Sequence, residues 1–139
     1  MAVQSFTPSK ASPSFSGLVN EIITIVTYLT TTVALTVSDV LGGFIVATNA
    51  GAITATLPAA ASLVPQIPGA QVGSAIRVFV KCGGAGTVTV AAGTGVTITG
   101  TATVATTAIK EFLLVVTAVG DQNGVGATYT AYSLGTSTF

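Results

Sequence analysis

The sequence predicts an all-β fold: an antiparallel β-sandwich or jelly-roll-like single domain that follows an extended N-terminal arm. Apolar residues alternate with threonines in several short runs, and a period of two is the pattern of a half-buried strand. Glycine-containing loops separate these runs at short intervals, as in sandwiches and barrels. The 139 residues suffice for one domain with a substantial core. We therefore expect an arm at residues 1–17 and a β domain at residues 18–139.

The first 37 residues leave two alternatives open. Residues 1–17 are rich in Ser and Pro, which suits a disordered tail, but Phe6 and Phe15 favour an arm that docks on a neighbouring subunit. Residues 18–37 fit either a helical stripe or strands. Their density of Ile, Val and Thr favours one or two strands, broken near Thr30 to Thr32.

Residues 39–57 are expected to form one complete β-hairpin. The pair Ser38 and Asp39 can cap a single helical turn before it. Apolar residues alternate in FIVAT (44–48) and in ITATL (53–57), and the residues between these runs include Asn and Gly, which tolerate a positive φ. After the hairpin, residues 58–74 contain three of the five prolines. We expect a long crossing loop there, with a turn of helix at Ala59 to Leu63.

The remaining strands are expected in the second half of the chain. Alternation and turn residues predict them at 75–81, 87–91, 96–104, 111–119 and 126–134. Within 96–104 the alternation directs Val96, Ile98, Ala102 and Val104 inward and leaves a ladder of threonines outside. Glycine runs at 83–86 and 93–95 read as hairpin turns, because neither has the residues of a phosphate-binding loop.

The strand at 111–119 is apolar on both faces, so both faces need cover. One face carries Leu113, Val115 and Val119, and we expect a subunit interface there. Tyr129 and Tyr132 fall on opposite faces of the last strand, so at most one of them is in the core. Tyr132 is an interface candidate, since Tyr is enriched in interfaces.

Charge and composition exclude several classes of function. The four basic and four acidic residues cancel, which removes the electrostatic footprint of a nucleic-acid binder. The chain has no His, and its single Cys82 is expected to be a buried or partly buried free thiol. The usual catalytic triads and zinc ligand sets are therefore missing, and we expect no enzyme, no cofactor and no metal site. Arg77 and Lys81 share a strand face with Phe79, where a solvated face is favoured over a binding patch.

No membrane partner is expected either. The most apolar window, Ile22 to Val37, is 16 residues long and contains six threonines. A spanning helix needs about 20 predominantly apolar residues. The N-terminus does not look like a secretory signal. Because a chain with 6% charged residues risks association, we expect it to work within an assembly in the cytosol or in a particle made there.

The pattern over about residues 38–134 resembles the small β-sandwich modules of tailed-bacteriophage virion proteins. The resemblance is carried by SDVLGGFIVATNAGAITATLPAA, by IRVFVKCGGAGTVTVAAGTGVTITG, and by a hydrophobic strand with a final Tyr-containing strand. The chain departs from the family in its long 58–74 loop and in having Tyr129 and Tyr132 where a Trp-like residue is usual. Such modules occur in capsid decoration or head-fibre proteins and in tail fibres, and the family carries no catalytic residues.

The resemblance implies a non-enzymatic capsid decoration or cement subunit on the outside of a phage head. Its expected partners are the major capsid protein and further copies of itself, as a homotrimer. The alternative is a tail-fibre or receptor-binding module that recognises a host surface glycan, although the loops lack Trp. A bacterial surface or pilus-like subunit would need an export signal.

Overall fold

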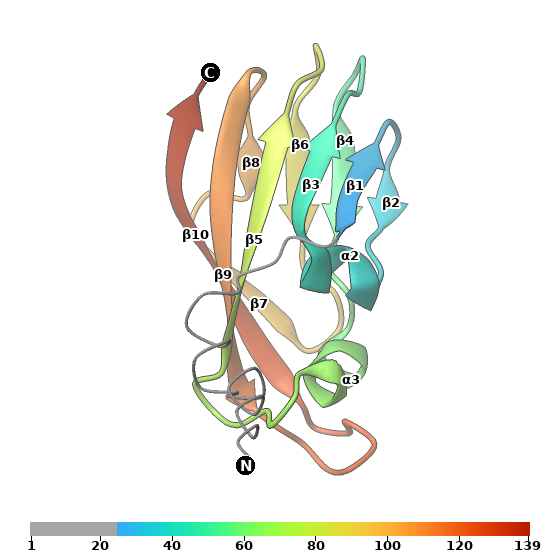
Figure 1. Cartoon of the computed structure of the whole chain (residues 1–139), viewed down its shortest axis with the longest axis vertical. Coiled ribbons are helices and arrows are strands. Elements are labelled where there is room, and N and C mark those ends of the chain that lie inside the picture. The colour runs from blue at the N-terminus through green and yellow to red at the C-terminus, as the bar shows by residue number, and fades with distance from the viewer. Residues whose placement is uncertain (1–24) are drawn as a thin grey trace, which may run out of the picture.

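A computed structural model describes residues 25–139 as a largely β fold with two mixed sheets (Figure 1). The six-stranded sheet has the order β1-β3-β5-β9-β10-β7, and the four-stranded sheet has the order β2-β4-β6-β8. The strands are β1 (Ile25–Leu29), β2 (Val33–Ala34), β3 (Gly43–Ala47), β4 (Ile53–Thr56), β5 (Ala75–Cys82), β6 (Val88–Ala91), β7 (Val96–Thr99), β8 (Thr103–Val104), β9 (Ala108–Ala118) and β10 (Thr128–Thr138). The helices are α2 (Val37–Gly42), α3 (Ala60–Leu63) and the 3₁₀ turn η2 (Val64–Gln66).

The expectation of antiparallel sheets is wrong. Strands β1, β3 and β5 run parallel to one another, as do β2, β4 and β6. Antiparallel pairing begins only where β9 joins β5 and β8 joins β6. The parallel pairing arises because α2 and the α3–η2 segment each return the chain from the four-stranded sheet to the starting end of the six-stranded sheet. The next strand therefore runs in the same direction as the earlier strand of that sheet.

The predicted hairpin at 39–57 is also wrong, although its two strands exist. Strand β3 belongs to the six-stranded sheet and β4 to the four-stranded sheet. The loop between them is therefore an arch, a turn that carries the chain from one sheet to the other. Alternating runs joined by a short Gly-containing loop fit a hairpin and an arch equally well, so the local pattern does not distinguish them.

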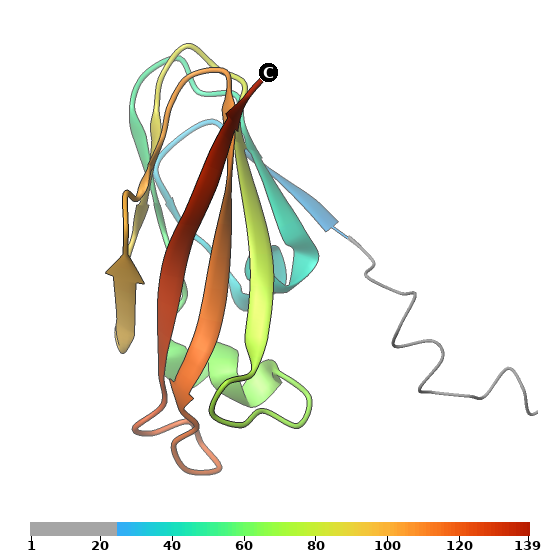
Figure 2. The ribbon, with the colours of Figure 1, turned by 90° about the vertical axis from the view of Figure 1, so that its left-hand side faces the viewer.

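Four such arches stack at one end of the molecule, the upper end in Figures 1 and 2. They join β1 to β2, β3 to β4, β5 to β6 and β8 to β9. Their backbones bond to the neighbouring arch: Thr48 N–H donates to Leu29 O at 2.8 Å, and Gly83 N–H donates to Ala47 O at 2.8 Å. Thr106 Oγ1 lies 3.2 Å from the carbonyl oxygen of Gly86 in the same stack. The arches thus stabilise one another instead of closing on themselves.

Asn49 and two glycines fix the spacing of the central arches. The Asn49 side chain is 1% exposed, and its Nδ2 donates to Gly51 O and to Thr87 O of the next arch. A Cβ on Gly84 would lie 2.0 Å from Asn49 O, and one on Gly86 would lie 2.0 Å from Gly51 O. Only glycine allows the two loops to approach this closely.

The predicted strand 96–104 is two strands in different sheets. The alternation is as expected, because Val96, Ile98 and Ala102 are half-buried, Val104 is buried and the threonines are exposed. The chain changes sheets at Gly100, whose φ is 96°, a conformation that favours glycine. Periodicity continues across this break, so it does not reveal the change of partner.

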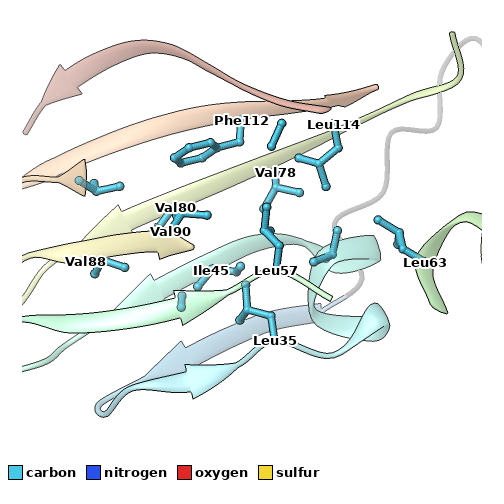
Figure 3. Close-up of a cluster of buried hydrophobic side chains, with 14 of the residues drawn as sticks. Leu35, Ile45, Leu57, Leu63, Val78, Val80, Val88, Val90, Phe112 and Leu114 are labelled. Atoms are coloured by element: carbon cyan, nitrogen blue, oxygen red, sulfur yellow. The ribbon is translucent and has the colours of Figure 1, made fainter. Parts of the chain in front are cut away.

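One hydrophobic core joins the two sheets (Figure 3). Ile45, Val78 and Phe112 reach it from the six-stranded sheet, and Ala55 and Val88 reach it from the four-stranded sheet. Cys82 is also buried and is a free thiol, as predicted, with Sγ 3.0 Å from Gly86 O.

The helical connections lie where the sequence predicts them, but the residue that caps α2 differs from the prediction. A break in the strands at 30–32 and helical turns within 58–74 are confirmed. Helix α2 is capped by Thr36, not by Ser38. Asp39, the third residue of α2, forms a capping box with Thr36. Thr36 N–H donates to Asp39 Oδ2 at 2.8 Å, and Asp39 N–H donates to Thr36 Oγ1 at 3.2 Å.

Candidate functional site

The candidate site is the outer face, the surface of the six-stranded sheet that points away from the core. On β9 every second residue from Ala108 to Val116 is buried, so the residues between them point outward. The same alternation holds on β3 and β5. The outer face contains Tyr28, Phe44, Val46, Arg77, Phe79, Lys81, Ile109, Glu111, Leu113, Val115 and Tyr132.

The centre of the outer face is a row of three residues from three strands. Leu113 on β9 pairs in register with Arg77 on β5 and with Tyr132 on β10. Leu113 is half-buried, and Tyr132 is 40% exposed. Val115 lies in the next row, opposite Thr130. The structure therefore brings together three of the predicted interface residues, Leu113, Val115 and Tyr132.

Other predicted interface residues lie elsewhere. Val119 follows the end of β9 and packs against the core, so it does not belong to the outer face with Leu113 and Val115. Phe6 and Phe15 lie outside the described residues. The prediction about the two tyrosines of the last strand is confirmed, because Tyr129 is 1% exposed and Tyr132 lies outside the core.

Aromatic and charged groups alternate across the rest of the outer face. The rings of Phe44 and Phe79 lie 6.4 Å apart at an interplanar angle of 33°. Arg77 Nε and Glu111 Oε2 form an ion pair at 3.3 Å, with the Arg side chain 60% exposed. Such an exposed pair contributes little stability. It nevertheless neutralises two of the few charges on this surface, which leaves the centre of the face close to neutral.

The C-terminus borders the same face. Lys81 Nζ lies 4.4 Å from the centroid of the Phe139 ring, a cation–π arrangement. Phe139 N–H donates to Thr107 O at 2.9 Å, which attaches the end of the chain to the stacked arches. The predicted grouping of Arg77, Phe79 and Lys81 on one strand face is confirmed, but Arg77 and Lys81 have partners that the sequence did not indicate.

Sequence reasoning missed Tyr28. It lies on β1 in register with Val46 and is 70% exposed, the largest exposed fraction among the large apolar side chains of the described region. The ambiguity between helix and strand at 18–37 left its side-chain direction undetermined. Once β1 is known as a strand, alternation from buried Leu29 places Tyr28 on the outer face.

Sequence reasoning also missed the burial of Lys110. Its side chain is on the core face of β9 and is 5% exposed. Nζ donates to Thr101 O at 2.8 Å and to Thr103 O at 2.9 Å, and burial lowers the pKa of the amine. Lys110 thus holds the segment that carries the chain from β7 to β8. Its side chain points away from the outer face and stabilises the fold.

A second surface feature is a shallow pocket of about 560 Å³ between α2, the α3–η2 connection and the loop before β10. Uncharged side chains line it: Val37, Ser38, Leu41, Ala61, Ser62, Pro65, Gln66, Gln122 and Asn123. Hydroxyl and amide groups offer hydrogen bonds there, but the lining includes no ionisable group for acid–base chemistry.

The loop 121–124 is stabilised by its own acidic residue. Asp121 Oδ1 accepts hydrogen bonds from Asn123 N–H at 2.8 Å and from Val125 N–H at 2.9 Å. Within residues 25–139 no group of three or more His, Cys, Asp or Glu side chains is arranged to hold a metal ion. The carboxylate of Asp121 therefore has a local structural role in this turn.

Comparison with known proteins finds no family model, no curated protein and no solved structure that matches the chain. No helix among residues 25–139 is long and apolar enough to cross a membrane. The case for a function therefore depends on the chemistry of the outer face.

Proposed function

We propose that the chain is a non-enzymatic virion structural protein, a decoration or cement subunit that binds the outside of a phage head and stabilises it. In this proposal its partners are the major capsid protein and other copies of itself. The two sheets around one core would constitute the β-sandwich of the virion modules that the sequence resembles. The observation that carries the proposal is the composition of the outer face.

The outer face suits contact with another protein. Leu113 and Tyr132 lie side by side at its centre, and the charges of Arg77 and Glu111 at its centre are paired with each other. Aromatic and aliphatic side chains at the centre of a patch, with charge kept to paired or peripheral positions, are typical of protein interfaces. A partner can cover the centre of this face without burying an unpaired charge, which would be costly.

Attachment would follow from repetition. A specific interface buries about 800 Å² per partner, which a broad sheet face can supply. A subunit that contacts two adjacent capsomers, and is repeated by the symmetry of the capsid, gains stability at each contact. The cement function thus needs no catalytic group and no cofactor, only a rigid face presented by hydrogen-bonded strands.

One observation favours the alternative, a tail-fibre or receptor-binding module. The pocket beside α2 combines Ser38, Ser62, Gln66 and Asn123 with no charged side chain, a lining that suits a neutral hydroxylated ligand such as a glycan. Its polar side chains are exposed and none of its side chains is aromatic. We favour the decoration role because apolar and aromatic side chains make up most of the outer face but only about half of the pocket lining.

Immunogold labelling of intact particles from the virus whose genome encodes the chain tests the proposal. Label distributed over the head is expected. Label confined to the tail tip would replace the decoration role with the alternative, and absence of the chain from purified particles would reject both.

A pair of variants tests the outer face itself. Leu113→Lys places an unpaired positive charge beside Arg77 at the centre of the face. We expect this variant to bind heads that lack the protein at least tenfold more weakly than the unmodified chain does. Thr103→Lys adds the same charge at an exposed position of the four-stranded sheet and is the control. Equal binding by both variants and the unmodified chain would show that another surface attaches the protein.

A further inference from the structure

The first arch leaves an open edge on both sheets. β1 pairs only with β3, and β2 pairs only with β4, among the strands of residues 25–139. In Figure 1 these two strands lie together at the right-hand side of the molecule. The β3–β4 and β5–β6 arches each lie between two neighbouring arches, and at the far end of the stack β9 is covered by its pairing with β10. The β1–β2 arch is therefore the exposed end of the stack.

Hydrogen-bond directions identify which backbone groups are free at this edge. Leu29 O accepts from Thr48 N–H, the residue after β3, so the polar backbone groups of Leu29 point toward β3. Backbone groups of successive residues in a strand point in opposite directions. The N–H and C=O of Tyr28 consequently point away from the sheet. On the other sheet, Leu35 N–H donates to Thr56 O, so the backbone groups of Leu35 point toward β4. By the same alternation, the N–H and C=O of Ala34 point away from the sheet.

This edge lacks the features that usually protect an edge strand. Residues 25–34, IVTYLTTTVA, contain no charged residue and no proline, and the pairing of β1 with β3 shows no bulge. Lys, Pro, a bulge or a very short strand are the usual means of preventing edge-to-edge association. β1 has five residues, whereas β2 has two, so β1 offers the longer template.

The other edges of the two sheets are less suited to pairing. β8 has two residues. β7 lies next to α3, since Ala60 N–H donates to Thr94 O, and a Cβ on Gly95 would lie 3.1 Å from the Cβ of Ala60. Among the described strands, β1 is the longest edge strand. It contacts α2 through the Thr27 hydroxyl, which donates to Asp39 Oδ1 at 2.8 Å, whereas Tyr28 is exposed.

The sequence upstream of β1 contains a segment that lacks the pattern of an edge partner. SPSFSG (12–17) has no alternating apolar residues, and proline cannot donate to a strand ladder.

We propose that β1 pairs with β1 of a second copy of this chain, antiparallel and about a two-fold axis, so that the two six-stranded sheets become continuous. Two identical uncharged strands meet without like-charge repulsion, and a two-fold contact uses the same surface on both copies. This contact gives a dimer, whereas the resemblance to virion modules led us to expect a homotrimer. It is independent of the virion role, which concerns the outer face.

Concentration-dependent hydrogen exchange on the full chain tests the pairing without any mutation. The Tyr28 amide should exchange rapidly at low protein concentration and become protected at high concentration. The Leu29 amide, which faces β3, should be protected at both and serves as the internal reference. Rapid exchange of Tyr28 at every concentration would overturn the proposal, whatever happens at the capsid.

Light scattering on two variants separates backbone pairing from side-chain contact. Tyr28→Pro removes the N–H that points away from the sheet and leaves the hydrogen bonds between β1 and β3 in place. We therefore expect this variant to be a monomer. Tyr28→Thr truncates the side chain but keeps the N–H, so we expect the dimer of the unmodified chain. Dissociation of both variants would show that the tyrosine ring makes the contact. A trimeric or monomeric unmodified chain would also contradict the proposal, while leaving the virion role open to its own test.

Discussion

The hydroxyl of Tyr129 donates a hydrogen bond to the carbonyl oxygen of Pro58 at 2.7 Å, across 71 positions of the sequence. This buried contact joins the last strand, β10, to the point where the chain leaves β4. Burial raises the pKa of the Tyr129 hydroxyl, because an anion would be poorly solvated there.

Tyr129→Phe should lower the free energy of unfolding by about 1–3 kcal/mol, because it leaves the buried carbonyl of Pro58 without its donor. Urea denaturation measures the loss. Tyr132→Phe is the matched control on the same strand, and its exposed hydroxyl should contribute almost nothing. Equal stability of both variants would show that the hydrogen bond to Pro58 is not needed.

Gly86→Ala should destabilise the protein by about 2 kcal/mol or more. The new Cβ would overlap the backbone of Gly51, so the two central arches must separate and lose the hydrogen bond from Gly86 N–H to Asn49 O. Gly51→Ala is the control, since a Cβ at that position meets no atom within 4 Å. Thermal unfolding of both variants checks the prediction, and a similar melting temperature for the two would contradict the close approach of the arches.

Asp39→Asn should remove part of the acid sensitivity of the fold. Burial by itself would raise the pKa of Asp39, but hydrogen bonds from the Thr36 N–H and the Thr27 hydroxyl outweigh it and hold the pKa below 3.8. The unfolded chain therefore binds more protons in this range. The stabilisation is complete above pH 3.8 and is lost as the pH falls through the lower folded value.

The measurement is the free energy of unfolding from about pH 6 to about pH 2, where carboxylates titrate. Relative to the Asn variant, the unmodified chain should be more stable by about 1 kcal/mol at the upper end, and the difference should shrink toward the acid end. A constant difference over this range would show that the carboxylate is not what titrates.

Lys110→Met should change the pH dependence of stability in the alkaline range. Burial lowers the folded pKa of Lys110 below 10.5, so between the two values the unfolded chain binds more protons. The unmodified chain should therefore gain stability relative to the Met variant as the pH rises through the folded pKa toward 10.5. The difference between the two proteins isolates Lys110, because Tyr129 titrates in both. A difference that stays flat would indicate that the amine is solvated in the folded state.

Local sequence patterns predicted most of the strands but not how they pair. Alternation identified the residues that became β3, β5, β6 and β9, and it directed Phe112 inward and Leu113 outward. It extended the last strands imperfectly, since β9 begins at Ala108 and β10 continues to Thr138. Pairing partners are set by backbone hydrogen bonds between distant segments, and alternation carries no information about them.

The candidate site was predicted in part for the same reason. Leu113 and Val115 were found because a strand that is apolar on both faces needs a second cover, and Tyr132 was found because it lies on the opposite face of its strand from Tyr129. Tyr28 was missed because its segment was ambiguous, and Val119 was assigned to the wrong surface because the strand ends before it. Lys110 was missed because charge normally indicates exposure, and only the carbonyl groups of Thr101 and Thr103 make its burial tolerable.

The sequence by itself determined that this protein is built from short strands, that its four basic and four acidic residues cancel, and which side chains alternate between core and surface. The tertiary structure decided that the loop after β3 is an arch and not a hairpin. The physical reason is that the Asn49 side chain bonds to Thr87 O of the next arch, and that glycine at 84 and 86 allows the two arches to approach closely. Those contacts join segments more than thirty positions apart, and they leave β1 as the free edge of the stack.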